Sequence, residues 1–534
     1  MIYVNQFVLN IINQLRKFYL RSNFYDQKIS KTNNENIIYK PSPHLLSSLI
    51  KYQKKKKRIE DFSLDEIWNR NNINDKDFKQ LNSFYWLFSL DLKSSKQKTQ
   101  LVIKNWIDFN QKYNDESWDF DLTSKRIIAW LSYHSLTFEE GSIEYKKKFN
   151  TIIQKQTNHL INEIKRSELV DDKLIGCASI ILVGLSYQDE KKYLSFGLNQ
   201  LKKISKISLD NNGFPKSRNI KQLVFYLKYF VLIREWFKEA QINIPEQIDE
   251  TIYHLGQGYS FIWQNTNTNI LYNGNNISDN SVFDNYLKRF GYKFKNENQD
   301  FGGYIIFRNK KICLTMDTGS SPYSEFSRDY QSGALSFEIT SNGNKLISNC
   351  GYHKTGLKLN ELSKSSAVHN TLVLDDNSSC KFSKVQNSLL IKKGLKVIKK
   401  NTIFEPDYWK ISAAHDGYQK KYNTIHERDI EFFPKQMIFV GTDKIIKKTN
   451  NNYKFDIRFH MEPNVKLMKT QDNKTILIEL ENEGWRFTCD NYDINIDNGL
   501  YFGIKNLYKV NQNILISGIS STQNERIKWE IKKI

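Results

Sequence analysis

The amino-acid sequence predicts a multidomain α+β protein in which a helical array is followed by an antiparallel β-sandwich. Its 534 residues are too many for one ordinary hydrophobic core, so two or three domains are expected. Apolar residues recur at helical spacing up to about residue 290, and from Gly303 onward they alternate in short runs. The change of period predicts a domain boundary within residues 296–303.

The N-terminal region contains amphipathic segments joined by short connections rich in Asn, Asp and Lys. The clearest helix is predicted over 219–239, where one apolar stripe contains Leu223, Tyr226, Leu227, Phe230, Ile233 and Phe237. Similar patterns predict helices over 43–57, 99–113, 123–137, 143–166, 174–186, 190–204 and 248–263. Consecutive helices without intervening strands form either a solenoid or a closed toroid, and both remain open at this point.

The C-terminal region is predicted to be a series of strands separated by turns. Alternating runs occur at 304–307, 312–316, 411–414, 436–440, 455–460, 476–480 and 485–489. Leu335, Phe337 and Ile339 alternate with Ser336 and Glu338, which predicts a half-buried strand with these two polar side chains on its outer face. Asn342-Gly343 then supplies a turn toward a second apolar run, so a hairpin is expected. This many consecutive strands favours an antiparallel β-sandwich.

The net charge favours an acidic partner. Lysine and arginine number 79 against 58 Asp and Glu, which gives a formal charge of +21. A polyanionic glycan, a nucleic acid or an anionic lipid fits this charge, and compositional bias of the source is the alternative explanation. Nucleic-acid binding is disfavoured because no module with interleaved aromatic and basic residues is present. The lysine-rich runs 54–58 and 146–148 are interpreted as solvated helix faces.

The cysteines, the N-terminus and the apolar runs bear on the compartment. The five cysteines are scattered without CxxC spacing, so neither a disulfide framework nor a zinc knuckle is predicted. Residues 1–22 interleave apolar residues with Asn, Gln and Arg, which predicts an amphipathic helix rather than a signal peptide. No apolar run approaches the roughly 20 residues of a membrane span. A soluble protein is expected, and the lack of a clear signal peptide favours the cytoplasm.

Three segments form an ordered set of strand motifs: LSFE at 335–338, NCG at 349–351 and AVHNTLVLDD at 367–376. This set resembles the C-terminal half of the heparinase II/III-like family of polysaccharide lyases. Further similarity lies in LDNNGFPKSRN at 209–219, AAHDGY at 413–418, RFHMEP at 458–463 and GWRF at 484–487.

The resemblance implies an α/α toroid, an incomplete helical barrel, followed by the antiparallel sandwich. The expected domains are an N-terminal helical extension at 1–60, the toroid at 61–295 and the sandwich at 296–534. Because family members commonly work outside the cytoplasm, the periplasm or cell envelope stands beside the cytoplasm as an expected location. The oligomeric state stays open.

The resemblance also implies cleavage of a uronic-acid-containing acidic polysaccharide by β-elimination. That chemistry needs a group that neutralises the carboxylate, a base for the C5 proton and an acid for the departing O4. The alternative is a catalytically degenerate protein that binds glycans or processes envelope polysaccharides, in which the cleft persists without the acid–base groups.

Several positions of the family's site carry different residues here. The family's Asn-His-Leu stretch aligns with 172–174, so Lys173 would neutralise the carboxylate, and the toroid tyrosine falls near Gln222. Arg218, which precedes the 219–239 helix, is a second cation for a carboxylate. The family's metal positions carry Gln331, Asn349 and His369. One strong ligand is fewer than the three or four a transition metal needs, so no metal and no other cofactor is expected.

The remaining candidates come from the strand motifs. The predicted catalytic residues are His369, Tyr418 and His415, and further substrate contacts are predicted at Tyr330, His426, Arg428, Arg458 and His460. Each has a structural alternative. Asp456, Arg458 and His460 share one strand face, which is more typical of an ion pair, and Asp416 is able to cap its own turn within 415–418. For His369 the alternative is a hydrogen bond to the hairpin.

Overall fold

The computed structural model describes residues 2–31, 36–47, 49, 74–90, 95–188, 191–264, 269–385 and 388–534. The chain divides into two compact units, which we call the helical unit and the β-rich unit. The helical unit contains Met1–Ile207, Phe225–Ile252 and Asn280–Lys293, and the β-rich unit contains Ser208–Val224, Tyr253–Asp279 and Phe294–Ile534. This division differs from a cut at residue 295, because two segments before that residue pack with the strands. The expected boundary at residue 60 lies outside the described residues.

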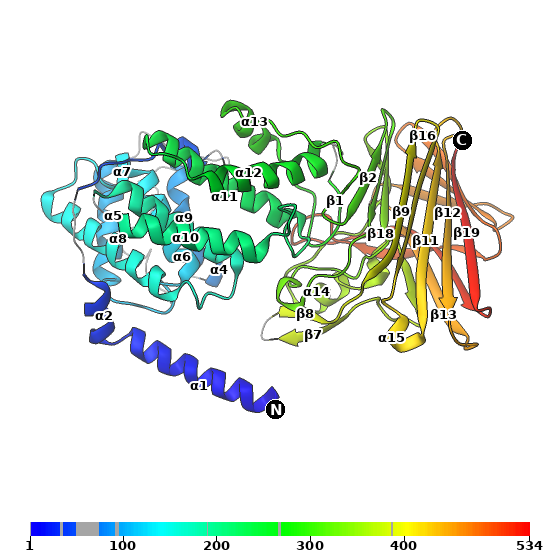
Figure 1. Ribbon diagram of the computed structural model, residues 1–534, viewed down its shortest axis with the longest axis horizontal. Helices are drawn as coiled ribbons and strands as arrows, with labels where there is room; N and C mark the ends of the chain where they lie inside the picture. Colours follow the sequence, from blue (N-terminus) through cyan, green and yellow to red (C-terminus); the bar gives the residue numbers. More distant parts are fainter. Residues whose placement is uncertain are drawn as a thin grey trace. The chain divides into compact units, whose positions relative to one another are not determined.

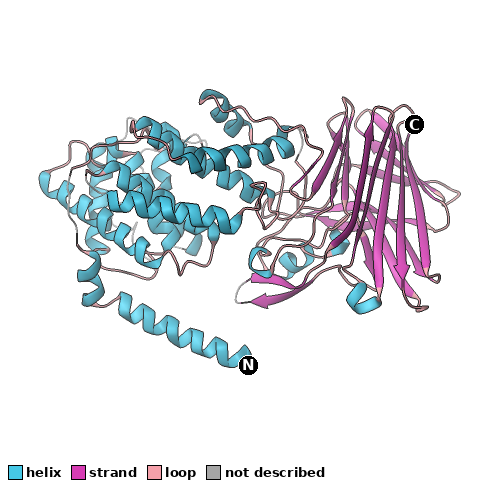
Figure 2. Ribbon diagram, viewed as in Figure 1, coloured by secondary structure: helices cyan, strands magenta, loops and turns pink. Residues whose placement is uncertain are grey.

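Helices dominate the N-terminal part of the chain and strands the C-terminal part (Figure 2). The helices of this part (Figure 1) are α1 (Ile2–Leu20), α2 (Asn23–Ile29), α3 (Pro43–Ser47), α4 (Asp75–Asn82), η3 (Tyr85–Ser89), α5 (Lys96–Phe109), α6 (Phe120–Ser132), α7 (His134–Thr137), α8 (Ile143–Glu163), α9 (Val170–Ser186), α10 (Lys191–Ser208), α11 (Ile220–Glu239), α12 (Glu246–Tyr259), η4 (Ser260–Gln264) and α13 (Ser281–Arg289). Of the segment predicted at 43–57, residues 43–47 and 49 are described.

Side-chain caps explain where several of these helices begin. Ser95, Asp119 and Ser142 accept hydrogen bonds from backbone N–H groups of the first turns of α5, α6 and α8. The segment predicted as one helix over 123–137 is instead two helices, α6 and α7, which meet at Tyr133. Within the described part of the chain, no helix is both long and apolar enough to cross a membrane.

In the residues that the structure describes, the strands form four sheets in which neighbouring strands pair antiparallel. The five-stranded sheet contains, in spatial order, β1 (Asp300–Phe301), β2 (Tyr304–Arg308), β3 (Ile312–Asp317), β4 (Phe337–Ser341) and β5 (Asn344–Ile347). The eight-stranded sheet contains β14 (Lys466–Lys469), β15 (Thr475–Leu480), β16 (Glu483–Cys489), β19 (Asn524–Lys533), β12 (Ile438–Lys447), β11 (Thr424–Phe433), β10 (Tyr408–His415) and β9 (Val397–Glu405).

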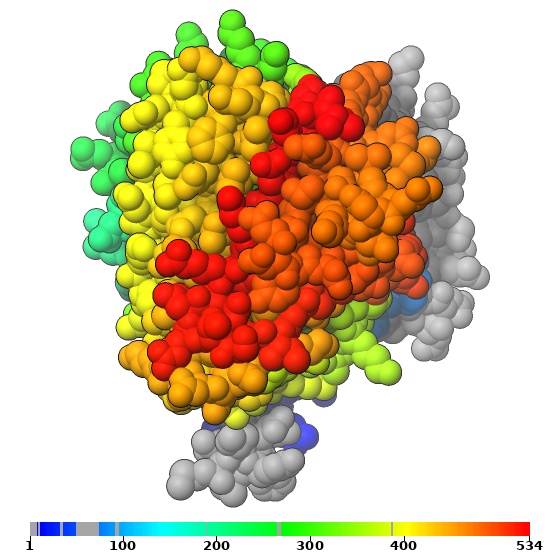
Figure 3. Space-filling view, turned by 90° about the vertical axis from the view of Figure 1, so that its right-hand side faces the viewer, coloured from blue at the N-terminus to red at the C-terminus, as the bar shows by residue number. Residues whose placement is uncertain are grey.

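A four-stranded sheet contains β17 (Ile494–Tyr501), β18 (Lys509–Ser520), β13 (Tyr453–His460) and β6 (Leu372–Leu374), and β7 (Lys381–Val385) pairs with β8 (Ser388–Lys393). Short helices interrupt the strands: η5 (Ser324–Phe326), α14 (Leu357–Ser363), η6 (Ser366–Val368) and α15 (Gln419–Tyr422). Figure 3 views the eight-stranded sheet from outside, with β19 in red between yellow and orange strands. One hydrophobic core joins the three larger sheets, so the predicted antiparallel β-sandwich is confirmed.

The predicted hairpin is present, but its first strand is not half-buried. Asn342 and Gly343 join β4 to β5 with φ values of +47° and +88°, the left-handed geometry that a two-residue hairpin turn requires. The expectation that Glu338 faces solvent is wrong, since that side chain is 1 % exposed. Its carboxylate accepts hydrogen bonds from Lys345 and from the Leu271 backbone N–H, because the chain around residue 271 covers the second face of β4.

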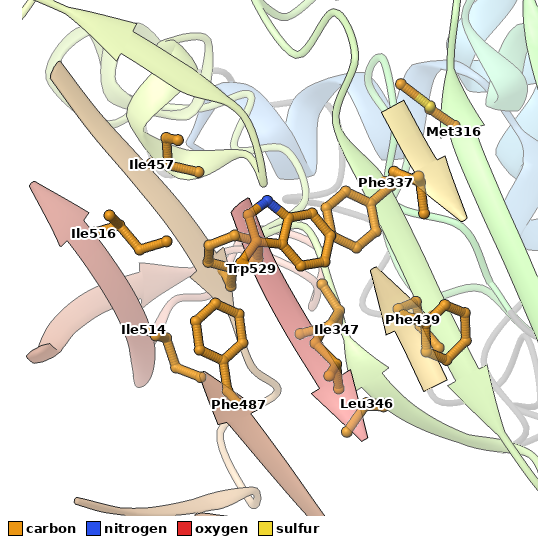
Figure 4. Close-up of a cluster of buried hydrophobic side chains, with 14 of the residues drawn as sticks. Met316, Phe337, Leu346, Ile347, Phe439, Ile457, Phe487, Ile514, Ile516 and Trp529 are labelled. Carbon is orange, nitrogen blue, oxygen red and sulfur yellow. The ribbon is translucent and has the colours of Figure 1, made fainter. Parts of the chain in front are cut away.

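Trp529 of β19 is central to the sandwich core (Figure 4). Its ring stacks on Phe337 of β4 with centroids 5.4 Å apart and on Phe487 of β16 with centroids 6.2 Å apart. Its Nε1–H donates to Asp443 Oδ2 at 3.0 Å. The indole therefore connects side chains of two sheets, and its position leaves no spare volume beside β12.

Replacing Gly441 with alanine is expected to reduce the free energy of unfolding by about 1–3 kcal/mol, because the added methyl overpacks the core. A Cβ at Gly441 would lie 2.0 Å from Cζ2 of Trp529. Urea unfolding measures the loss. Gly484→Ala is the control, because its Cβ would meet the terminal Ile534 side chain at 2.9 Å. Equal losses in both variants would contradict the packing described here.

Candidate functional site

Arg218 occupies the connection before α11 and is fixed inside the β-rich unit. Its guanidinium donates through Nη1 to Gly319 O at 3.1 Å, and through Nη2 to Gly303 O at 2.9 Å and Asp317 Oδ1 at 2.7 Å. It also lies 4.7 Å from the ring centre of Tyr304. Burial acts to lower the pKa of Arg218, but the Asp317 carboxylate outweighs it and holds that pKa above its usual range. Protein acceptors thus already engage the predicted cation for a substrate carboxylate.

Asn219 follows as the cap of α11 and ties the helix start to a distant loop. Its Oδ1 accepts from the backbone N–H groups of Lys221 at 2.8 Å and Gln222 at 3.2 Å. Its Nδ2 donates to Asp329 Oδ2 at 3.1 Å. The other carboxylate oxygen, Asp329 Oδ1, accepts from the Tyr352 hydroxyl at 3.0 Å. A single carboxylate therefore joins the helix cap to the loop after β5.

Lys221 completes this arrangement. Its ammonium donates to Asn276 Oδ1, and Asn276 Nδ2 donates to Tyr352 O at 2.7 Å. Burial lowers the pKa of Lys221 to about 8, and the nearby charges of Lys505 and Lys354 act in the same direction. We call Asn219, Lys221, Asn276, Asp329 and Tyr352 the Lys221 cluster.

The chemistry of the Lys221 cluster suits an acidic ligand. Lys221 is half-buried, and Lys354 and Lys505 beside it are exposed. The Tyr352 hydroxyl donates to Asp329 and accepts from Asn360 Nδ2 at 3.0 Å. Burial, followed by the Asp329 charge, raises the pKa of Tyr352, so the phenol keeps its proton at neutral pH. The cluster therefore offers cations for a carboxylate beside a hydroxyl that can transfer a proton.

Sequence reasoning did not identify this cluster as a site. Lys221 lies within the strongest predicted helix, and Tyr352 follows directly after the NCG motif at 349–351. One signal was present in the sequence: a polar residue, Asn219, immediately before that helix is typical of a cap. The partners Asn276 and Asp329 are distant in sequence and carry no local pattern that links them.

His369 is fully buried in the β-rich unit. Burial, with a smaller effect of His460, lowers the pKa of His369 to about 3, and neither ring nitrogen has a hydrogen-bond partner among the described residues. Gln331 Nε2 donates to Gly351 O at 2.9 Å, and Asn349 Oδ1 accepts from the Asn370 N–H at 3.0 Å. Both amides therefore connect backbone segments. Over the ranges that the structure describes, no group of three acidic, His or Cys side chains is placed to hold a metal. The absence of a metal or other cofactor stays a prediction.

Three other predicted residues meet in a buried network. Arg428 Nε donates to Asp443 Oδ1 at 2.8 Å, and His426 Nε2 lies 2.7 Å from the same oxygen. His426 Nδ1 lies 3.3 Å from His415 Nε2, and His415 Nδ1 accepts from the Gly417 N–H at 3.0 Å. Because His415 Nδ1 accepts a hydrogen bond, the proton of His415 is on Nε2, which donates to His426 Nδ1. The proton of His426 is then on Nε2, which donates to Asp443. Burial lowers the pKa of both histidines, so both are neutral.

The turn after β10 differs in one detail from the expected one. His415, and not Asp416, accepts a backbone N–H of this turn. Asp416 Oδ1 instead accepts from the Lys396 N–H at 2.6 Å. It therefore connects the end of β10 to the residue before β9. The Tyr418 hydroxyl donates to Leu372 O at 2.7 Å and is buried with its ring. The segment is a turn, but its imidazole rather than its carboxylate forms the cap.

The remaining predicted residues are spread over both units. Arg458 Nη2 lies 3.3 Å from Asp456 Oδ2, which confirms the ion-pair interpretation of that strand face. His460 Nε2 lies 2.9 Å from Ala367 O, and Gln222 Oε1 accepts from Ser217 Oγ at 2.6 Å. Tyr330 is buried in the β-rich unit. Lys173 belongs to α9 of the helical unit.

Comparisons with known proteins agree with this architecture. The family model "Heparinase II/III-like, C-terminal" matches residues 297–530. A heparinase III structure is similar over 96% of this chain and 85% of that chain, with a TM-score of 0.70 and 14% identity. A heparan sulfate lyase from Pedobacter heparinus is similar over 96% of this chain and 83% of that chain, with a TM-score of 0.65 and 13% identity. The predicted fold class, a helical toroid followed by a β-sandwich, is confirmed.

One curated protein is similar over a shorter stretch. FtsZ-localized protein C from Caulobacter vibrioides is 23% identical over 245 residues, which is 43% of this chain and 42% of that protein. This chain therefore matches less than half the length of that relative.

Proposed function

Because this chain belongs to the heparinase II/III-like family, with the family's C-terminal domain over residues 297–530, we propose that it is a polysaccharide lyase. Its substrate would be a uronic-acid-containing acidic glycan, cleaved by β-elimination. The observation that carries the proposal is the half-buried Lys221 ammonium, whose pKa is lowered to about 8, beside the Asp329–Tyr352 hydrogen bond.

The cluster provides two of the groups that β-elimination needs. The uronate carboxylate must be neutralised before the C5 proton becomes acidic, and a lysine ammonium stabilises the charge that develops there. Lys221 is assigned this role, which the sequence gave to Arg218 or Lys173. Arg218 donates to Gly303 O and Asp317, so its role in the proposal is to position the helix start. Tyr352 is assigned as the proton donor to the departing O4.

The test is a screen of purified protein against a panel of acidic polysaccharides. An ultraviolet absorbance increase from the unsaturated uronate product is expected on at least one of them. A protein that binds members of the panel and yields no such product on any would overturn the lyase assignment.

A second candidate function is glycan binding without cleavage, as part of envelope-polysaccharide processing. It is favoured by the burial of the predicted catalytic side chains, since His369, His415 and Tyr418 are each at most 1 % exposed. Binding of acidic glycans without product formation is the result that this candidate predicts.

Binding is expected to depend on pH through Lys221. Its pKa is lowered to about 8, so the ammonium is present below that pH and is lost as the pH rises through it. Affinity for a uronate oligosaccharide should therefore fall near pH 8 instead of near the usual lysine pKa of about 10.4. Titration calorimetry across this range measures the change.

The control is Lys221→Arg, in which the cation persists across the whole range. Lys364, whose pKa burial also lowers to about 8, is present in both proteins. If affinity for the oligosaccharide falls by the same factor near pH 8 in Lys221→Arg, the titrating group is therefore not Lys221.

A further inference from the structure

A separate basic cavity lies within the β-rich unit. Residues of α14, of the β7–β8 hairpin and of the segment around α15 enclose about 680 Å³. This volume is in the range of small-molecule sites. Five lysines line it: Lys364, Lys381, Lys393, Lys420 and Lys421. Two carboxylates also line it, so its formal charge is positive and an anionic ligand is favoured.

Three of these five lysines have side chains without an ion pair or hydrogen bond in the described ranges. Lys364 is not among them, because its ammonium donates to the backbone carbonyls of Arg328 at 2.6 Å, Tyr330 at 3.1 Å and Leu389 at 3.2 Å. Lys421 donates to an asparagine at 2.9 Å. The other three side chains are exposed and form no ion pair or hydrogen bond within the described ranges; they are Lys381, Lys393 and Lys420.

The wall of the cavity contains a buried hydroxyl that lacks a partner. Tyr422 is 6 % exposed, and its OH has no hydrogen-bond partner in the part of the chain that the structure describes. Buried polar groups are normally hydrogen-bonded. Tyr418 and Phe382 line the same cavity. Aromatic faces with a few polar groups are suited to sugar rings, and the Tyr422 hydroxyl is suited to a ligand oxygen.

Helix α14 contributes residues both to this cavity and to the surroundings of the Lys221 cluster. Its Asn360 donates to the Tyr352 hydroxyl at 3.0 Å, and its Glu361 lines the cavity. The ammonium of Lys364, just after α14, lies 5.9 Å from the ring centre of Tyr352 and 4.8 Å from that of Phe382. An extended acidic ligand that reaches the Lys221 cluster therefore has a second cationic site beside the same short helix.

We propose that this cavity is a second acidic-glycan subsite, which binds carboxylate- or sulfate-bearing sugar units of the chain that the Lys221 cluster engages. The identity of the ligand rests on the proposed function. The binding does not require cleavage. Lys381, Lys393 and Lys420 provide the charge, and Tyr422 provides a hydrogen bond to a sugar oxygen.

The test compares two triple variants that lose the same net charge. Lys381→Ala/Lys393→Ala/Lys420→Ala removes these three cavity lysines. The matched control replaces Lys311, Lys448 and Lys474 with alanine, which are exposed lysines of the same unit that do not line the cavity. Calorimetric titrations use a sulfated heparan sulfate oligosaccharide, an oligogalacturonate of equal length and inorganic sulfate.

The cavity variant is expected to lose about tenfold in affinity for at least one oligosaccharide, equivalent to about 1.4 kcal/mol. The control should lose much less. Equal losses in the two triple variants would overturn the proposal, as would inorganic sulfate binding as tightly as the oligosaccharides. Tyr422→Phe keeps the ring and should weaken binding with an unchanged melting temperature.

Repeating the titrations in Lys221→Ala separates this subsite from the lyase proposal. Binding that persists in that variant and is lost on adding the cavity substitutions supports the subsite even if no polysaccharide is cleaved. If Lys221→Ala alone abolishes all oligosaccharide binding, the cavity does not bind the ligand by itself. That result would overturn the subsite proposal.

Discussion

Replacing Arg428 with alanine is expected to lower the free energy of unfolding by about 3–5 kcal/mol, since it breaks a fully buried ion pair. The guanidinium donates to Asp443 through Nε at 2.8 Å and Nη2 at 3.0 Å, and to Leu335 O at 2.9 Å. Burial acts to raise the pKa of Asp443, but Arg428 and His426 hold it well below its usual range. Without Arg428, the carboxylate stays buried and loses its main counter-charge.

Urea unfolding measures this loss, and a more exposed pair of the same unit provides the control. Arg458→Ala breaks the ion pair with Asp456, in which the Arg458 side chain is 19% exposed and that of Asp456 7% exposed. It should cost less than Arg428→Ala, because Asp456 keeps the hydrogen bond that Ser517 Oγ donates to it at 2.6 Å. The sequence suggested that Arg428 contacts substrate. An Arg428→Ala protein as stable as wild type, with weakened glycan affinity, would favour that interpretation over the structural one.

Replacing Lys221 with alanine is expected to reduce kcat/KM on a cleaved uronate glycan by about 10²–10³-fold, the effect of removing one group that stabilises developing charge. Lys221 is held against Asn276 beside the Asp329–Tyr352 hydrogen bond, so its ammonium is positioned before substrate arrives. Steady-state kinetics measured by ultraviolet absorbance give kcat and KM separately. The larger part of the loss should fall on kcat, because the charge develops in the transition state.

Lys505→Ala is the matched control, because Lys505 acts on Lys221 through its charge and is itself exposed. It should change kcat/KM only a few-fold, since an exposed charge is screened by solvent. Melting temperatures confirm that both variants fold. If Lys221→Ala were folded and fully active, the neutraliser would lie elsewhere, and Lys173 of the helical unit would become the next candidate.

Some features of this protein were determined by short sequence patterns. The apolar stripe over 219–239 predicted α11 to within a residue, because every third or fourth side chain faces the same core. Asn342-Gly343 predicted the β4–β5 turn, because left-handed φ values strongly favour these residues. The strand motifs also indicated the family and the order of the two architectures. Each of these depends on residues that are close in sequence.

The sequence patterns did not predict strand β9 or the burial of Glu338. β9 (Val397–Glu405) was missed because it is the last strand of its sheet and most of its side chains are exposed. An edge strand of this kind can carry lysines in place of alternating apolar residues. Glu338 was expected at the surface, because alternation shows that one face of a strand is buried and does not show what covers the other.

The candidate site was decided by tertiary structure alone. Asn219 and Asp329 are 110 positions apart, and Lys221 and Asn276 are 55 apart. The sequence shows which residues are cationic. It does not show which cation binds acceptors inside the protein and which one lies near solvent. Arg218 and Lys221 are three positions apart, and the fold places Asp317 against the first and an asparagine amide against the second. Burial and long-range partners set the charge that each can offer, and neither is determined by neighbours in the sequence.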